Sequence, residues 1–178
     1  MVTHWVRLQE APLFELKSLR PDAIPAALSK AERYRLLNEP EQAVSICQDI
    51  LRTQPRHQEA VRLYLLAVTD GFRFHRPPDV WRARALLDQL DSAYERCYYA
   101  GIIDERHARA ALEHGGALAT HEAYQGFRRA MDWYSQAEAI RPAGNDDAIL
   151  RWNTCVRCLM ENAQLHPVAE ESSELRLE

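Results

Sequence analysis

The sequence predicts an all-α protein of about seven helices, arranged as antiparallel helical hairpins that stack on one another. Two segments, residues 22–55 and 126–158, carry alanine and other small residues at helical spacing. Proline, asparagine and glycine separate the helical segments, which dominate from Pro21 onward. Small residues let two antiparallel helices pack closely, and hairpins of this kind bury their apolar faces by stacking.

The composition is ordinary for a soluble globular protein. The chain has 178 residues, of which 47% are hydrophobic and 27% charged, and its formal net charge is −4. This charge gives no general attraction to nucleic acid or anionic lipid. The first residues lack the basic and apolar segments of a signal peptide, and no apolar run is long enough to span a membrane. We therefore expect a cytoplasmic protein with reduced cysteines.

The N-terminal segment and the first hairpin follow from local signals. Residues 1–21 are a mixed lead-in whose apolar side chains favour docking on the hairpin, as a short helix or an extended segment; a disordered arm is the alternative. A first helix is expected over residues 22–37, with Asp22 as its N-cap. A second helix over residues 40–53 begins at Pro40, where a missing amide donor does little harm.

The next segments are less regular. A third helix is expected over residues 57–71, and its apolar positions recur at three- and four-residue spacing. A loop with two prolines follows over residues 72–78. A long fourth helix is expected over residues 80–100, with Asp79 as its N-cap and Gly101 as its end.

Glycines mark the expected boundaries after that helix. Asp104 predicts the N-terminus of a fifth helix. The pair Gly115-Gly116 should kink or split it, because each glycine costs about 1 kcal/mol relative to alanine in a helix. Gly126 predicts the turn that follows.

Two further helices complete the domain. The sixth is expected over residues 127–140, and the seventh runs from an Asn145 cap to about Leu165. We therefore expect one helical domain over residues 22–165. Residues 166–178 carry an excess of glutamate and are expected to form an exposed, mobile, acidic tail.

These residues resemble the tetratricopeptide repeat family. The first match lies over residues 22–55, and its positions are Ala27, Ala31, Tyr34, Ala43, Cys47, Ile50 and Pro55. The second match lies over residues 126–158, and its positions are Gly126, Ala130, Tyr134, Ala137, Pro142, Ala148 and Trp152. The resemblance implies a right-handed solenoid of hairpins with one concave face, which binds partners and rarely makes catalytic sites.

The spacing of the two matches departs from the family. Ala43 and Ala130 are 87 positions apart, which is 19 more than two repeats of about 34 residues would give. We expect the extra residues to lengthen the fourth and fifth helices and the loop before them. The middle hairpin should then project beyond its neighbours.

Three clusters could carry chemistry, and each also has a structural explanation. Cys155 and Cys158 form a CxxC pair that could bind metal or act in redox chemistry, although packing is the simpler explanation. Three histidines recur at seven-residue spacing, too far apart on a straight helix to share an ion; they are His107, His114 and His121. The pair Asp146-Asp147 could bind a divalent ion, but it also complements a helix dipole. We predict no catalytic residue, cofactor or metal.

Two surfaces are candidates for partner binding. The inward positions of the first and third helices lack the family's carboxylate clamp, yet they offer a mixed groove of Glu32, Arg35, Arg62 and Leu66. Residues 72–84 combine arginine and aromatic side chains, which anchor many protein interfaces and also stack on single-stranded nucleic acid. A protein partner is favoured over nucleic acid there. The candidate residues of this edge are Phe74, Arg76 and Trp81.

The sequence thus predicts a non-catalytic protein-interaction or scaffold module that binds a peptide or a subunit of another protein. Two alternatives remain open: a structural subunit of a larger assembly, and an accessory factor that uses the CxxC pair for metal or redox chemistry. No membrane insertion and no small-molecule substrate are expected. The identity of the partner is not encoded in any motif.

Overall fold

The fold is all-α, as predicted. A computed structural model describes residues 14–74 and 77–166, and this part of the chain contains α-helices and short 3₁₀ helices but no strand. The α-helices are α1 (Ile24–Leu36), α2 (Pro40–Thr53), α3 (Gln58–Asp70), α4 (Val80–Leu87), α5 (Ala93–His114), α6 (Ala117–Ala139) and α7 (Asp147–Glu161). The 3₁₀ helices are η1 (Pro21–Ala23) and η2 (Gly71–Arg73). None of the helices in the described ranges is both long and apolar enough to cross a membrane.

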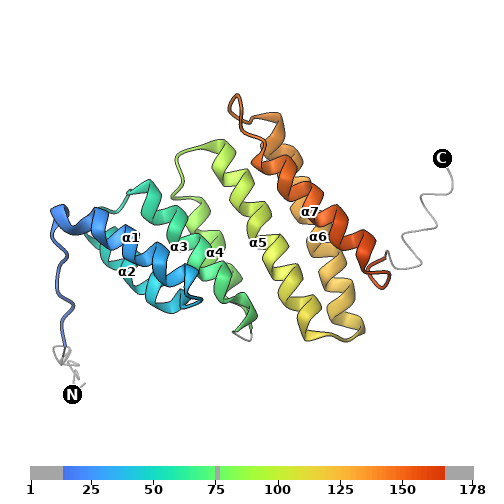
Figure 1. Cartoon of the computed structure of the whole chain (residues 1–178), viewed down its shortest axis with the longest axis horizontal. Coiled ribbons are helices and arrows are strands. Elements are labelled where there is room, and N and C mark those ends of the chain that lie inside the picture. Colours follow the sequence, from blue (N-terminus) through green and yellow to red (C-terminus); the bar gives the residue numbers. More distant parts are fainter. Residues whose placement is uncertain (1–13, 75–76, 167–178) are drawn as a thin grey trace, which may run out of the picture.

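The helices follow one another along the long axis of the molecule (Figure 1). Each helix packs against the next one in the sequence, from α1 and α2 at one end to α6 and α7 at the other. Helix α3 also contacts both α1 and α5, so these three helices lie side by side. The most extensive packing joins α5 to α6.

The first hairpin forms where the sequence predicts it. Asn38 has a positive φ of 61°, a backbone conformation that asparagine tolerates better than most residues, and it turns the chain after α1. Pro40 then occupies the first turn of α2. Asp22, however, lies within η1, and Ala23 takes the N-cap position of α1.

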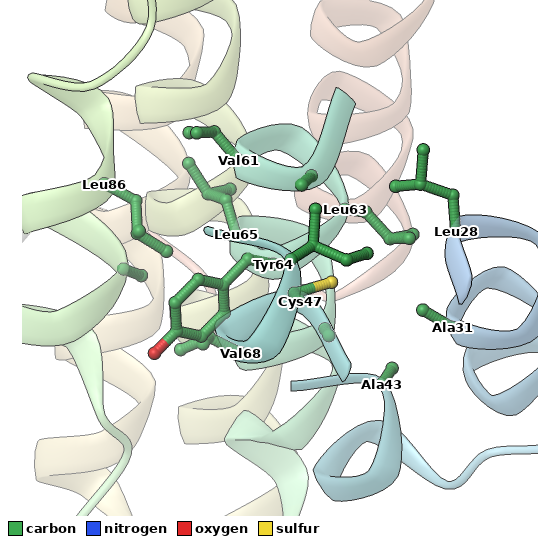
Figure 2. Close-up of a cluster of buried hydrophobic side chains, with 14 of the residues drawn as sticks. Leu28, Ala31, Ala43, Cys47, Val61, Leu63, Tyr64, Leu65, Val68 and Leu86 are labelled. Atoms are coloured by element: carbon green, nitrogen blue, oxygen red, sulfur yellow. The ribbon is translucent and has the colours of Figure 1, made fainter. Parts of the chain in front are cut away.

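Small side chains hold the N-terminal helices together. One apolar cluster joins α1, α2, α3 and α4, and Cys47 lies inside it (Figure 2). Five alanines in this cluster are fully buried: Ala31, Ala43, Ala60, Ala67 and Ala83. Because alanine adds little bulk, the backbones can approach closely there. Cys47, one of the positions of the first match, is a free, buried thiol.

The lead-in contacts this hairpin through its last residues. The Arg52 side chain donates to the carbonyl of Lys17 at 2.6 Å, and the Thr53 hydroxyl donates to the carbonyl of Leu19. Phe14 and Leu16, by contrast, are about four-fifths exposed. The tail predicted after Leu165 falls largely on residues 167–178, which lie outside the described residues, as do residues 1–13.

The prediction of one long helix over residues 80–100 is wrong. A turn over residues 88–92 separates α4 from α5. Ser92 caps α5 by accepting a hydrogen bond from the amide of Glu95, a serine–glutamate spacing typical of helix N-termini. The Gln58 side chain fixes the turn, since it donates to the carbonyl of Gln89 and accepts from the amide of Asp91. This capping signal, Ser92 followed three positions later by Glu95, is visible in the sequence alone.

Two glycines that were predicted to mark helix ends lie inside helices. Gly101 lies within α5, and a Cβ there would come within 2.4 Å of the Tyr134 ring on α6. Gly126 lies within α6, and a Cβ there would come within 2.8 Å of the Ala108 Cβ. Asp104, predicted to begin a helix, is likewise inside α5. These glycines mark close helix packing instead of helix ends.

The glycine pair at residues 115 and 116 does split the helix. Both residues have positive φ, 72° and 94°, and they form the turn between α5 and α6. These two helices have 22 and 23 residues, whereas the other α-helices have between 8 and 15. The fourth helix, predicted to be lengthened, is thus the shortest α-helix in the described ranges, and the long helices are α5 and α6.

The C-terminal core packs α5, α6 and α7 around large aromatic side chains. Tyr134 and Phe127 are fully buried in this second apolar cluster. Helix α7 contributes Ala148, Cys155 and Cys158 as its buried residues, while Trp152 is only partly buried. Asp146, and not the predicted Asn145, takes the N-cap position of α7, while the side chain of Asn145 accepts a hydrogen bond from the amide of Asp147 in the turn before the helix. This core gives α5 a rigid support next to the site described below.

Candidate partner-binding groove

A groove of about 380 Å³ opens between the C-terminal ends of α1 and α3 and the facing parts of α5 and α7. Arginine dominates its lining, so we call it the arginine groove. Its arginines are Arg35, Arg73, Arg106, Arg109 and Arg151. Its acidic residues are Asp70, Glu105 and Glu113. The groove thus joins helices from the N-terminal and C-terminal halves of the chain.

Asp70 holds one side of the groove. Its carboxylate accepts a hydrogen bond from the Nε of Arg35 at 2.7 Å, and its other oxygen lies 2.7 Å from the Nη1 of Arg106. Arg106 also donates to the carbonyl of Leu66 and to the hydroxyl of Thr69, at 3.0 and 2.6 Å. These contacts tie α1, α3 and α5 together. Burial lowers the pKa of Arg106, although Asp70 opposes this effect.

Glu105 holds the other side, and its side chain is only 1% exposed. It accepts hydrogen bonds from the Nε of Arg109 at 3.1 Å and from the Tyr134 hydroxyl at 2.8 Å. The Nε of Arg151 lies 3.1 Å from the same carboxylate but is not aligned for a hydrogen bond. Burial and the neighbouring Glu105 charge raise the pKa of Tyr134, which therefore stays a donor. Glu105 links α5 to α6 and α7.

A second buried carboxylate, Asp104, does not line the groove and instead connects α5 to α4 and α6. Its Oδ1 accepts a hydrogen bond from Arg84 of α4 at 2.7 Å and lies 3.6 Å from the Nε of Arg129 of α6. Its Oδ2 makes no hydrogen bond within the described residues. Neighbouring positions on a helix point about 100° apart, so Asp104 and Glu105 serve different partners.

The structure brings only one of the predicted groove residues into the arginine groove, namely Arg35. Arg62 pairs with Glu95 at 3.0 Å, and Leu66 packs against the C-terminal core. Glu32 is exposed on α1 and does not line the groove. Whether Glu32, Arg62 and Leu66 contact a partner stays a prediction.

The predicted aromatic edge is separate from the groove. Phe74 is 52% exposed and lies beside the turn between α1 and α2, and Trp81 is 75% exposed on α4. Neither residue lines the arginine groove. Arg76 lies outside the described residues.

Most residues of the groove were missed by sequence reasoning. Arg106, Arg109 and Glu113 share a face of α5 at spacings of three and four residues, which is a detectable helical signal. Because a helix end was predicted at Gly101 and a new helix start at Asp104, the full length of that face was not recognised. The pairing of Asp70 with Arg106 depends on how α3 packs on α5, and no local pattern encodes it.

The CxxC cysteines and His107 lie in packed surroundings. Cys155 and Cys158 are buried free thiols, and burial raises the pKa of Cys155 to about 12. His107 packs edge-on against Phe72 and lies 3.6 Å from Glu122. Within the described ranges, no group of three or more histidine, cysteine or acidic side chains could hold a metal ion.

We expect stability to fall as the pH rises above about 9. Burial raises the pKa of Cys47, Cys155 and Tyr99 to about 12 in the folded protein, from ordinary values of 9.0 for cysteine and 10.0 for tyrosine. The unfolded chain therefore loses these protons first, so stability is complete below pH 9 and declines above it. Urea unfolding midpoints at several pH values test this. A Cys47→Ala variant should show a weaker decline, and equal slopes would contradict the assignment.

Comparisons of the chain with protein-family models, curated proteins and solved structures gave no match.

Proposed function

We propose that the chain is a non-catalytic protein-interaction module whose partner occupies the arginine groove. The observation that carries the proposal is the convergence of five arginines from α1, η2, α5 and α7 on one groove. Arginine is enriched in protein interfaces, because its planar fork forms paired hydrogen bonds and its stem packs on apolar surface. The groove volume falls in the range of pockets that bind ligands or anchor side chains.

The arrangement of the helices supports the proposal. We propose that the hairpins stack as a short right-handed solenoid of the tetratricopeptide type, with α1, α3, α5 and α7 on the binding face. The contacts of α3 with both α1 and α5 support this order. In such solenoids the repeated helices create an extended concave surface for partners.

Exposed apolar residues near the groove extend the proposed interface. Leu36 lines the groove and is 84% exposed, and its neighbour Leu37 is 61% exposed. Phe74 lies close by, beside the turn that follows these leucines. A partner that places acidic groups in the groove could cover this apolar rim at the same time, which adds the hydrophobic contribution that interfaces need.

The test is co-purification of the tagged full chain from its native organism, followed by mass spectrometry. The groove variant is Arg73→Glu combined with Arg109→Glu, and the matched control is Arg157→Glu on the exposed face of α7. We expect one dominant protein with the wild type and the control, and about tenfold less with the groove variant. Circular dichroism establishes that all three proteins are folded. Equal capture by a folded groove variant would contradict the proposal.

A further inference from the structure

The charges that line the arginine groove do not balance. Five arginines face three carboxylates there, a formal excess of two positive charges, although the whole chain carries a net charge of −4. A local excess of cations in a negatively charged protein is not a general property of its surface. It indicates that this groove is built for an anion.

The arginines keep donors for a ligand. Arg35 and Arg109 both bind their carboxylates through Nε, at 2.7 and 3.1 Å. Their η nitrogens make no hydrogen bond to the residues that the structure describes. Each guanidinium is therefore oriented by a carboxylate, and that of Arg109 also lies over the Phe127 ring, 5.8 Å from its centroid. The paired ends of both forks keep their hydrogen-bond donors for a ligand. This is the geometry that recognises a planar or tetrahedral oxyanion.

Two further arginines strengthen the positive field. Arg73 lines the groove, is exposed, and makes no hydrogen bond or ion pair within the described residues. Arg106 is partly buried, with 23% of its side chain exposed, and burial lowers its pKa despite the contact with Asp70. A lowered pKa means that the positive charge is costly at that position. A bound anion would relieve this cost.

From the charge excess and the available arginine forks we infer that the groove binds a phosphoryl group carried on a side chain of the partner protein. A phosphorylated side chain carries about −1.5 to −2 charges at neutral pH and has three strong acceptor oxygens. It matches the excess of two charges, whereas a single carboxylate would leave one charge uncompensated. The inference rests on the proposed function and specifies the chemistry of its ligand.

The experiment measures retention of degenerate peptide libraries on the immobilised full chain. Three libraries share the same random flanks and differ at the fixed central position, which is phosphoserine, serine or glutamate. We expect at least tenfold greater retention of the phosphoserine library than of either other library. Arg73→Gln and Arg109→Gln should each reduce this retention several-fold, whereas Arg157→Gln should leave it unchanged. Arg35→Lys, which keeps the charge but removes the fork, should also reduce it.

The outcomes separate this inference from the proposed function. Equal retention of the glutamate and phosphoserine libraries, or retention insensitive to Arg73→Gln and Arg109→Gln, would overturn it. Inorganic phosphate serves as a competitor: if it binds as tightly as the phosphoserine library, the source is free phosphate and the inference about a side chain is wrong. A co-purified partner that depends on the groove but still binds after phosphatase treatment would leave the proposed function standing and overturn the phosphoryl inference.

Discussion

Replacing Glu105 with glutamine is expected to lower the free energy of unfolding by about 3 kcal/mol. The carboxylate is 1% exposed and contacts Arg109, Arg151 and Tyr134. Glutamine keeps the shape of the side chain but removes the charge that balances two arginines. The cost is an uncompensated, partly buried positive charge, which exceeds the loss of one hydrogen bond.

Urea unfolding monitored by circular dichroism measures the effect of Glu105→Gln. The matched control is Glu113→Gln, which removes an acidic group from an exposed position on the same helix. Surface substitutions of this kind change stability by about 0.5 kcal/mol or less. A Glu105→Gln variant as stable as the control would show that the buried network contributes nothing to the fold.

Replacing Gly126 with alanine is expected to destabilise the α5–α6 hairpin by about 2 kcal/mol, although alanine favours helix by about 1 kcal/mol. The new Cβ would come within 2.8 Å of the Ala108 Cβ and within 3.4 Å of the Ala108 Cα. Neither atom can move without the backbone, so the two helices must separate. Thermal unfolding measures the loss.

A compensating variant provides the control for this prediction. Ala108→Gly combined with Gly126→Ala moves the methyl group from α5 to α6 and removes the clash. The helix propensities of the two changes offset each other, so we expect the double variant to recover to within about 1 kcal/mol of the wild type. A double variant less stable than Gly126→Ala alone would contradict the close-packing explanation.

The sequence predicted the all-α fold and the first hairpin because the signals there are local. Asn38 and Pro40 form the turn after α1, and the turn needs no information from distant residues. The middle of the chain was misassigned because glycine has two different uses. Gly115 supplies a positive φ in a turn, whereas Gly101 makes room for Tyr134 on another helix. The same residue type gives no local indication of which use applies.

The candidate site was predicted only in part, because most of its residues are brought together by contacts between helices that are distant in the sequence. Arg35 was identified because its position on α1 follows from the helical period. Arg106 and Arg151 enter the groove only because α5 packs against α3 and α7 packs against α6. Their partners, Asp70 for Arg106 and Glu105 for Arg151, lie far from them in the sequence and on other helices. Such pairings arise from tertiary packing.

Site-specific photocrosslinking tests the central claim, that a partner occupies the arginine groove, most directly. A photoreactive amino acid is placed at Arg73 in the groove, at Trp81 on the aromatic edge, or at Arg157 on the outer face of α7. Cells of the native organism are then irradiated and the products are identified by mass spectrometry. We predict one dominant crosslinked protein from position 73 and none of it from position 157. The same protein crosslinked from position 157 but not from position 73 would contradict the assignment of the groove as the binding site.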